Sequence, residues 1–242
     1  MQKKYWIMGK NCIETILDHS PERIIEFFTA KKDSDPLLEK VRSKGIKIKL
    51  ASKQKLFDLV NSDSHQSYVA LVKAVDSPDL KQFLRENHRL VLMLDNINDP
   101  QNLGAILRAA ECFGVDAVIW SKNRGCSLTP SAAKAGVGAS ELVPTIVVSN
   151  LAETVKKFQK SGYFAVTAEI SDRASPLNAF QFPEKTLLIM GSEGKGIQPL
   201  ISKLADEQVY IPMSGKIDSL NVSQATAVLL SHYQKCFFDL KK

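Results

Sequence analysis

IPMSGKIDSLNVSQAT, residues 211 to 226, combines an apolar strand end, a loop of small polar residues and a helix start that carries Asn and Ser. Two segments precede it: DNINDPQNLGAILRAAECFGV at 95–115 and LLIMGSEGKGI at 187–197. All three follow predicted strands, and open α/β sheets bind their ligands beyond the carboxyl ends of the strands. Three such segments in order predict one composite binding site.

Strand and helix patterns alternate from residue 90 onward. Expected strands cover 90–94, 117–120, 142–148, 164–170, 187–191 and 209–213, and expected helices cover 103–113, 131–135, 151–161, 199–206 and 222–238. This alternation predicts an α/β fold in which a mostly parallel sheet carries helices on both faces.

The first 75 residues predict a second, smaller α/β unit. Helices are expected at 10–17, 36–44 and 53–60, and strands at 24–28, 46–50 and 67–75. The polar residues that follow show no strand pattern, so we expect a linker with one short helix. The predicted organisation is therefore a domain at 1–75, a linker at 76–88 and a larger domain at 89–242.

Composition narrows the class of protein. With 242 residues and 44% hydrophobic content, the chain has room for two domains with their own cores. No apolar run approaches the roughly 18 residues of a membrane span, and the first residues lack the apolar part of a signal peptide, so we expect a cytoplasmic protein without a membrane partner. The four cysteines have no CxxC spacing, which argues against a zinc site or a disulfide framework, and we expect buried thiols.

Basic residues are concentrated in one part of the chain. The net charge is +6, and residues 31–55 hold nine basic side chains against three acidic ones. In GIKIKLAS at 45–52, Ile46, Ile48 and Leu50 alternate with lysines, which predicts a strand with one buried and one basic face. This distribution favours a polyanion as partner, and an ordinary solvated surface is the open alternative.

The segment GSEGKG at 191–196 stands between a predicted strand and a predicted helix. Its glycines allow the backbone to approach a ligand closely, and the helix start offers free N–H groups. Lys195 is followed by Gly rather than by Ser or Thr, so the segment is not a P-loop. A plain tight turn is the alternative.

Several polar side chains in the three segments have both a functional and a structural interpretation. Arg108 stands in the apolar-rich run LGAILRAAECF, so we expect a partly buried guanidinium that needs an anionic or carbonyl partner. Asn102 can cap the helix that carries Arg108, and Ser219 and Asn221 can cap the last helix. Glu193 can compensate the start of the helix that follows it.

The motifs NLGAILRAAECFG at 102–114, MGSEGKGI at 190–197 and IPMSGKIDSLNVSQA at 211–225 resemble the three motifs of the SpoU/TrmH family. This family comprises RNA ribose 2'-O-methyltransferases of the SPOUT class. GKNCIETIL near the start, HQSYVALV at 65–72 and residues 131–154 are similar to the two-domain bacterial members that methylate a guanosine of 23S rRNA. In those members the N-terminal domain is similar to a ribosomal-protein-like RNA-binding fold, and Gly stands where this chain has Ser67.

The resemblance implies a trefoil-knotted α/β domain that forms a homodimer and binds S-adenosylmethionine in the knot, with no metal. The residues that it places at the cofactor are Gly191, Ile211, Met213, Leu220 and, as a weaker addition, Thr167.

The same resemblance implies that Arg108 is the central catalytic residue. Because the pKa of arginine lies above about 12, we favour phosphate anchoring and oxyanion stabilisation over a role as base. Side chains that would position Arg108 and the ribose are Asn102, Glu193, Ser219 and Asn221.

Contacts to RNA are expected from polar residues near these motifs and in the N-terminal segments that carry the resemblance: Lys122, Arg124, Lys134, Lys10, Asn11, His65 and Gln66. Solvated surface charge is the alternative for the cationic ones.

The preferred function is methylation of a 23S rRNA guanosine at the ribose 2'-hydroxyl. A tRNA 2'-O-methyltransferase is the near alternative, and a non-catalytic RNA-binding or ribosome-assembly protein is the alternative from another class.

Overall fold

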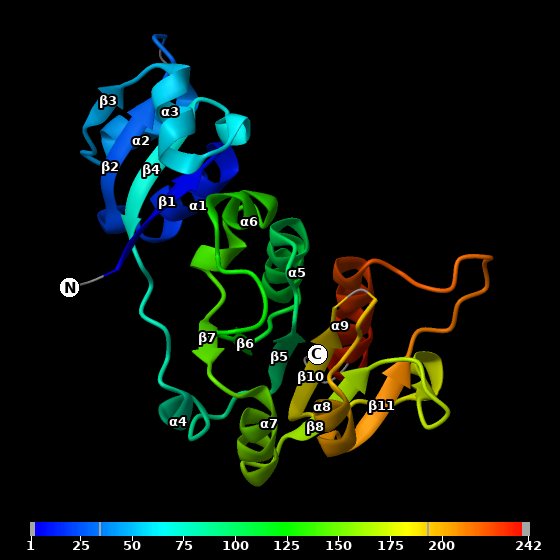
Figure 1. Cartoon of the computed structure of the whole chain (residues 1–242). Helices are drawn as coiled ribbons and strands as arrows, with labels where there is room; N and C mark the ends of the chain where they lie inside the picture. Colours follow the sequence, from blue (N-terminus) through cyan, green and yellow to red (C-terminus); the bar gives the residue numbers. More distant parts are fainter. Residues whose placement is uncertain (1–2, 34, 193, 239–242) are drawn as a thin grey trace.

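The computed structural model of the chain describes residues 3–33, 35–192 and 194–238, which fold into two α/β units around two separate sheets. Figure 1 shows the smaller unit in blue and cyan and the larger one in green to red. The segment that joins them contains α4 (Leu80–Phe83), so the short helix expected in the linker is present.

The smaller unit is built on a four-stranded sheet in the order β1-β4-β2-β3. Its strands are β1 (Lys4–Met8), β2 (Ile24–Thr29), β3 (Ile48–Leu50) and β4 (Tyr68–Lys73). The helices α1 (Lys10–His19) and α2 (Pro36–Ser43) pack on one face, and α3 (Lys53–Val60) packs on the other. Because successive strand residues point to opposite faces, Ile7 packs with α1 and α2 while Met8 packs with α3.

Two expectations for the smaller unit are wrong. No strand is predicted before residue 10, yet β1 pairs antiparallel with β4 and buries Ile7 and Met8 completely. Leu50 is expected to be buried but is 70% exposed, because β3 forms the edge of the sheet and ends at this residue.

The larger unit is built on a seven-stranded sheet in the order β7-β6-β5-β10-β8-β11-β9, and all its strand pairings are parallel. The strands are β5 (Leu90–Asp95), β6 (Ala117–Ser121), β7 (Thr145–Val148), β8 (Phe164–Ala168), β9 (Ser175–Pro176), β10 (Thr186–Gly191) and β11 (Glu207–Tyr210). The predicted parallel sheet is thereby confirmed, while β9 is not among the expected strands.

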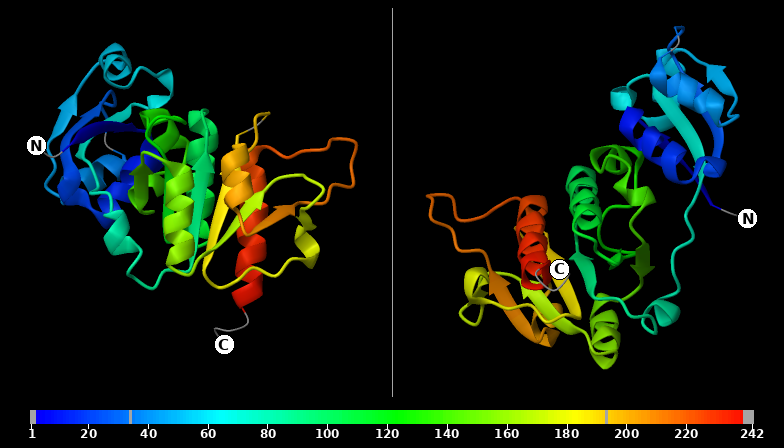
Figure 2. Two further views of the ribbon diagram at one scale, coloured as in Figure 1. Left: turned by 60° about the horizontal axis from the view of Figure 1, so that its bottom comes forward. Right: turned by 180° about the vertical axis from the view of Figure 1, so that it is seen from behind.

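Helices cover both faces of this sheet, as predicted. One face carries α5 (Pro100–Cys112), α6 (Pro130–Ala135) and α9 (Val222–Phe238), and the other carries α7 (Leu151–Lys160) and α8 (Pro199–Leu204). Figure 2 shows α5 and α9 beside each other. Leu92 packs with the first group and Met93 with the second, so β5 is buried on both sides.

Two element ends determine the position of the site. α5 begins at Pro100, three residues earlier than expected, and Asp99 Oδ1 accepts a hydrogen bond from the Gln101 N–H at 3.0 Å as its cap. β11 ends at Tyr210, three residues earlier than expected. Residues 211–221 therefore form a connection to α9 that extends away from the sheet (Figure 1).

Buried polar contacts join the two units. Arg23 Nη2 donates to Glu141 Oε2 at 2.7 Å, and the Tyr5 hydroxyl donates to the same carboxylate at 2.7 Å. Thr15 Oγ1 donates to the Val137 carbonyl at 3.1 Å. Burial, together with the Glu141 charge, raises the pKa of Tyr5 above its ordinary value. Because these groups are shielded from water, the contact fixes how the units are oriented.

No helix in the described part of the chain is both long and apolar enough to cross a membrane. All four cysteines are free thiols. Cys12 is buried but Cys112 is exposed, so the expectation of buried thiols is wrong for Cys112.

Candidate active site

The carboxyl ends of β5, β10 and β11 lie along one edge of the large sheet. β5 and β10 are hydrogen-bonded neighbours, and β8 alone separates β10 from β11. The three segments that the sequence predicts to share a site therefore leave the same edge of the sheet, the first two from neighbouring strands and the third one strand further on.

A buried carboxylate ties the first segment to the second. Asp95 ends β5 and is fully buried, and its oxygens accept from the backbone N–H of Gln198 at 2.7 Å and from its side-chain Nε2 at 2.6 Å. Gln198 Oε1 in turn accepts from the Arg124 guanidinium. Because an unpaired buried carboxylate is costly, this network holds the start of α8 against the end of β5.

A pocket of about 230 Å³ lies between the first and second segments. Most of the residues that line it are polar, namely Asn96, Asn98, Asp99, Asn102, Ser192 and Lys195, and Ile97 and Val222 complete the lining. We call it the amide pocket. Ser192 Oγ is buried there and has no hydrogen-bond partner among the described residues. The pocket thus presents both donors and acceptors to a polar ligand.

A second pocket, of about 160 Å³, lies between the end of β8 and the third segment. Its walls are mainly apolar and include Met190, Ile211, Met213, Leu220, Ala225 and Leu229. We call it the apolar pocket. Three of the five predicted cofactor residues, Ile211, Met213 and Leu220, line it. Ser219 also lines it, and its hydroxyl donates to Asp218 Oδ1 at 3.2 Å.

Asn221 connects the third segment to the first. Its Nδ2 donates to Asn102 Oδ1 at 2.9 Å, and its Oδ1 accepts from the Ser223 N–H at 2.9 Å. Asn221 therefore caps α9 and contacts Asn102 at the same time. Asn102 lies in the first turn of α5, which Asp99 caps, so capping is not the role of Asn102.

Arg108 is exposed, contrary to the expectation of a partly buried guanidinium. It makes no hydrogen bond or ion pair with another described residue. The buried side of α5 is formed by Leu103, Gly104, Ile106, Leu107 and Ala110. About 9 Å of rise and about 120° around the helix axis separate Arg108 from Asn102. Arg108 accordingly lines neither pocket.

Gly191 ends β10 at the start of a tight turn. A Cβ at Gly191 would lie 2.4 Å from the carbonyl carbon of Gly196, so no side chain fits there. The backbone turns tightly here, and the turn also borders the amide pocket through Ser192 and Lys195. Glu193 lies outside the described residues.

Thr167 is fully buried within β8, and its hydroxyl donates to the Glu207 carbonyl at 3.5 Å. It does not line the apolar pocket, whereas Ala168 and Glu169 do. The strand alternation that buries Thr167 brings the next residues of the chain to the pocket instead.

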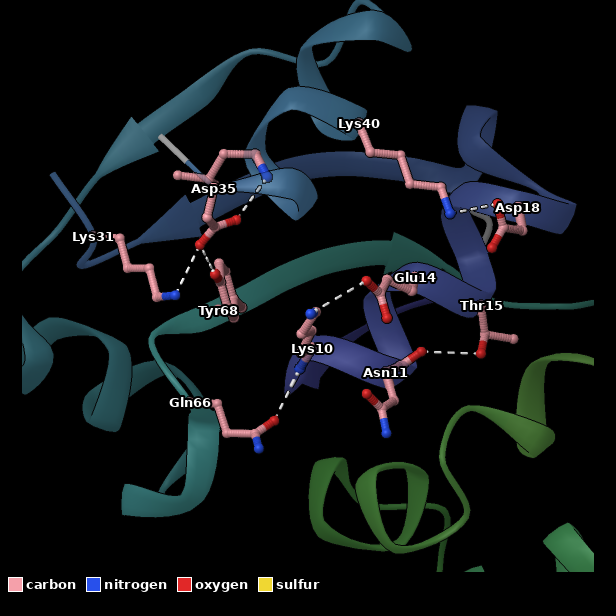
Figure 3. Close-up of polar contacts among 11 residues, drawn as sticks. Lys10, Asn11, Glu14, Thr15, Asp18, Lys31, Asp35, Lys40, Gln66 and Tyr68 are labelled. Carbon is pink, nitrogen blue, oxygen red and sulfur yellow. Dashed lines mark hydrogen bonds and ion pairs between the residues drawn. The ribbon is translucent and has the colours of Figure 1, made fainter. Parts of the chain in front are cut away.

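Four of the predicted RNA contacts gather around Gly9, where the two units meet. The Lys10 N–H donates to Gln66 Oε1 at 3.0 Å, as Figure 3 shows. A Cβ at Gly9 would lie 3.1 Å from that oxygen and 3.3 Å from Lys134 Cγ. Lys10, Asn11 and Gln66 are exposed. Together with Lys134 they form what we call the junction surface.

His65 differs from these four because it is only 5% exposed. Its Nδ1 accepts from the Ser67 N–H at 2.9 Å, which stabilises the turn before β4. Gln66 and Ser67 have φ values of 55° and 67°, in the left-handed region. The side chain of His65 is thus part of the turn and is not presented at the surface.

Lys122 and Arg124 follow β6 and are both exposed. Lys122 lines a cleft of about 510 Å³ between the two units, to which Lys3 also contributes. Arg124 is held by Gln198 at the large sheet. Lys122 therefore faces the cleft between the two units, whereas Arg124 lies near the carboxyl ends of the strands of the large sheet.

The basic residues between 31 and 55 are partly neutralised. Three of them form surface ion pairs, Lys31 with Asp35, Lys40 with Asp18 and Lys49 with Glu26. For these three the solvated-surface interpretation fits, since exposed pairs of this kind contribute little free energy. Among the described residues, no cluster of three or more His, Cys, Asp or Glu side chains forms a metal site.

Sequence analysis does not find Gln198, Glu169 or Ser192. Asp95 carries a usable signal, because a carboxylate directly after five apolar residues must find a donor. Its partner is 103 residues away in the chain, and no local pattern identifies it.

Comparisons with known proteins agree with this arrangement. Residues 89–231 match the SpoU rRNA Methylase family, and residues 6–78 match the family described as RNA 2'-O ribose methyltransferase substrate binding. The chain is 36% identical over 245 residues to the 23S rRNA (guanosine-2'-O-)-methyltransferase RlmB of Acinetobacter baylyi, with 98% of each sequence covered. It is 38% identical over 235 residues to the Escherichia coli protein of the same name, with 93% of this chain and 95% of the relative covered.

A solved structure shares the fold along almost the whole chain. The SpoU methyltransferase AviRb from Streptomyces viridochromogenes, crystallised in complex with the cofactor AdoMet, aligns with a TM-score of 0.79 at 20% identity. The alignment covers 98% of this chain and 91% of AviRb. Both units of the chain thus align with one solved protein.

Proposed function

Because the chain belongs to the SpoU rRNA methylase family, we propose that it transfers a methyl group from S-adenosylmethionine to a ribose 2'-hydroxyl of RNA. A guanosine of 23S rRNA is the preferred substrate, since both RlmB relatives carry that activity in their names and cover nearly the full chain. These relatives do not favour a tRNA substrate. The observation that carries the proposal is that an apolar and an amide pocket lie at the strand ends on either side of the Asn102–Asn221 hydrogen bond, with Leu220 lining the first and Val222 the second.

The apolar pocket fits the nucleoside part of S-adenosylmethionine. Ile211, Met213 and Leu220 offer apolar surface for an adenine ring. Gly191 does not line this pocket, because the backbone of Gly196 fills the space beside it. Glu169 Oε1 is a buried acceptor at this pocket without a described donor. When bound, S-adenosylmethionine supplies an electrophilic methyl group, and this chemistry requires no metal ion.

The protein must orient the ribose hydroxyl, take up its proton and stabilise the negative charge that develops on its oxygen. Asn102 lines the amide pocket, and Asn221 stands in the chain between Leu220 of the apolar pocket and Val222 of the amide pocket, so the two amides are placed to position the ribose. Ser219 approaches from the apolar pocket. Glu193 completes this proposed set, and the Arg108 guanidinium anchors a phosphate or the oxyanion.

We infer a homodimer through the methyltransferase domain, because Arg108 lines neither pocket of the chain that carries it. A groove between α5 and α9 is lined by Glu111, Cys112, Ser231 and Gln234, one helical turn from Arg108. A second copy that packs on this side of α5 brings Arg108 toward the amide pocket of that copy. The site would then be built from two chains.

We further infer that residues 1–75 bind RNA, that 89–242 carry out methyl transfer and that 76–88 link the two. The junction surface supports the first role, since its cation and amide groups suit phosphate and sugar contacts.

We also propose a trefoil-knotted path for the larger unit. β10 enters the sheet between β5 and β8, which both precede it in the chain, and this supports the proposal. An rRNA substrate supports a cytoplasmic location.

Mapping of ribose methyl groups tests the proposal. rRNA and tRNA from cells with and without the protein are compared, and the purified protein is assayed with labelled S-adenosylmethionine. We expect one guanosine methyl group of 23S rRNA to disappear and to return with the wild-type chain but not with Asn102→Ala. Loss of a tRNA methyl group instead would support the tRNA alternative. Unchanged methylation with impaired ribosome assembly would support a non-catalytic role.

A further inference from the structure

Glu169 places a carboxylate at the apolar pocket. It directly follows β8, and its backbone N–H donates to the Val209 carbonyl at 3.0 Å, so its position is fixed by the sheet. Its Oε1 is buried and accepts no hydrogen bond from a described residue. A buried carboxylate oxygen without a donor is costly in a folded protein. Because the Glu169 side chain lines the apolar pocket, a rotation of its carboxylate brings this oxygen to a donor on a ligand bound there.

Other carboxylates in and around the site have their donors within the protein. Asp95 accepts two hydrogen bonds from Gln198, and Asp99 at the amide pocket accepts from the Gln101 N–H. Asp218, the second carboxylate at the apolar pocket, is exposed and accepts from a neighbouring hydroxyl. Among the acidic side chains that the structure describes, Glu169 alone has a buried oxygen without a partner.

We propose that Glu169 binds the ribose diol of S-adenosylmethionine and so sets the affinity and the orientation of the methyl donor. This inference rests on the proposed function. Two neighbouring hydroxyl groups are both donors, and a carboxylate accepts both of them.

The positions of the two pockets favour the diol over the charged end of the cofactor. The apolar walls suit the adenine ring, which is bonded directly to the ribose, while the sulfonium must face the amide pocket to deliver its methyl group. Glu169 lines the apolar pocket and not the amide pocket. Its carboxylate therefore meets the nucleoside part of the ligand rather than the reacting part.

Ligand affinities test this assignment with Glu169→Gln and, as a matched control, Asp172→Asn, which removes an exposed carboxylate three residues away. Calorimetry with S-adenosylmethionine, S-adenosylhomocysteine and 5'-methylthioadenosine measures Kd. All three ligands carry the diol, whereas only the first carries the sulfonium. We expect Glu169→Gln to weaken all three by about tenfold to a hundredfold and the control to bind within about twofold of wild type.

The other outcomes separate this inference from the proposed function. If Glu169→Gln weakens the binding of S-adenosylmethionine only, Glu169 recognises the positive charge of the sulfonium. If the Kd is unchanged for all three ligands, Glu169 does not contact the cofactor. Either result overturns the inference but leaves the proposed function intact, provided that the wild-type protein binds the ligands. Wild-type protein that binds none of the ligands would overturn the proposed function itself.

Thermal unfolding without ligand separates ligand binding from a structural role. Because the buried oxygen has no donor in the protein, Glu169→Gln is expected to leave the Tm unchanged or to raise it. A lower Tm together with weaker binding would show that Glu169 stabilises the fold, and the proposal would then fail.

Discussion

Asn221 donates from Nδ2 to the Oδ1 of Asn102 at 2.9 Å, although 119 residues separate them in the chain. The contact joins the start of α9 to the first turn of α5, and the Asn221 Oδ1 is held by the N–H and the hydroxyl of Ser223 at 2.9 and 2.6 Å. The two amides are therefore oriented before any ligand arrives, and such preorganisation is what group transfer requires.

Asn102→Ala and Asn221→Ala are each expected to lower kcat for methyl transfer by about a hundredfold, because the ribose loses an oriented amide. Asn221→Ala should also reduce the free energy of unfolding by about 1 kcal/mol, since α9 loses its cap. Labelled-methyl assays and urea denaturation measure the two effects. Gln224→Ala, at an exposed position in the first turn of α9, serves as control, because it leaves both amides and their hydrogen bonds in place. Wild-type kcat in both asparagine variants would exclude them from the site.

Arg108→Ala is expected to leave the Kd for S-adenosylmethionine within about twofold of wild type and to lower methyl transfer by at least about a hundredfold, because a cation at the phosphate or oxyanion is lost. Calorimetry and a labelled-methyl assay measure these quantities. Lost cofactor binding, or retained turnover, would contradict the proposed role.

Mixed dimers show whether Arg108 acts on the second chain. When Arg108→Ala and Asn102→Ala chains are combined, one site of each mixed dimer contains an intact Asn102 from one chain and an intact Arg108 from the other. We expect activity to return on mixing if the site is shared between chains, up to about a quarter of the wild-type value for random pairing. Two inactive variants that stay inactive when mixed would place Arg108 in its own chain's site.

Arg23→Ala is expected to lower the free energy of unfolding by about 3–5 kcal/mol, because it leaves the buried Glu141 carboxylate without its cation. The side chain of Glu141 is only 2% exposed and that of Arg23 13%. Arg89→Ala is the matched control: its ion pair with Glu184 is more than half exposed on both sides, and its loss should cost below about 1 kcal/mol. Equal effects of the two substitutions in urea denaturation would contradict a buried contact between the units.

The sequence predicts the fold and the position of the three segments correctly where the local residue pattern agrees with the way the elements pack in the whole domain. The apolar run LVLML becomes β5, buried on both faces, and the rule that places ligands at strand ends brings the three segments together. Arg108 was misjudged because exposure on α5 depends on which side meets α6 and α9, not on the apolar character of adjacent residues. The Asp95–Gln198 contact and the position of β10 between β5 and β8 depend on the path of the whole chain, which no local window contains.

Ser67→Gly is expected to raise the free energy of unfolding by up to about 1 kcal/mol, because Ser67 has a φ of 67° in a region that disfavours a Cβ. The substitution keeps the backbone N–H that donates to His65 Nδ1. Ser43→Gly, in the last turn of α2, is the control and should lower stability by about 0.5–1 kcal/mol. Urea denaturation that shows the same sign for both variants would refute strain at Ser67.

Stability at low pH depends on Asp35. Burial opposes ionisation, but hydrogen bonds from Lys31 Nζ at 2.8 Å, from the Tyr68 hydroxyl and from the Leu38 N–H at 3.1 Å hold the pKa of Asp35 at about 2, below its ordinary value of 3.8 (Figure 3). The unfolded chain therefore binds this proton more readily than the folded one between those values. The stabilisation by ionised Asp35 is complete above the unfolded pKa and is lost as pH falls through the folded pKa.

Asp35→Asn removes this dependence while it keeps an acceptor for the cap of α2. We expect wild type to be more stable than Asp35→Asn near neutral pH and the difference between them to shrink as pH falls from 3.8 toward about 2. Urea denaturation at a series of pH values measures that difference, and Asp172→Asn controls for loss of a surface charge. A difference that stays constant down to the lowest pH would mean that the three donors do not stabilise the charged form of Asp35.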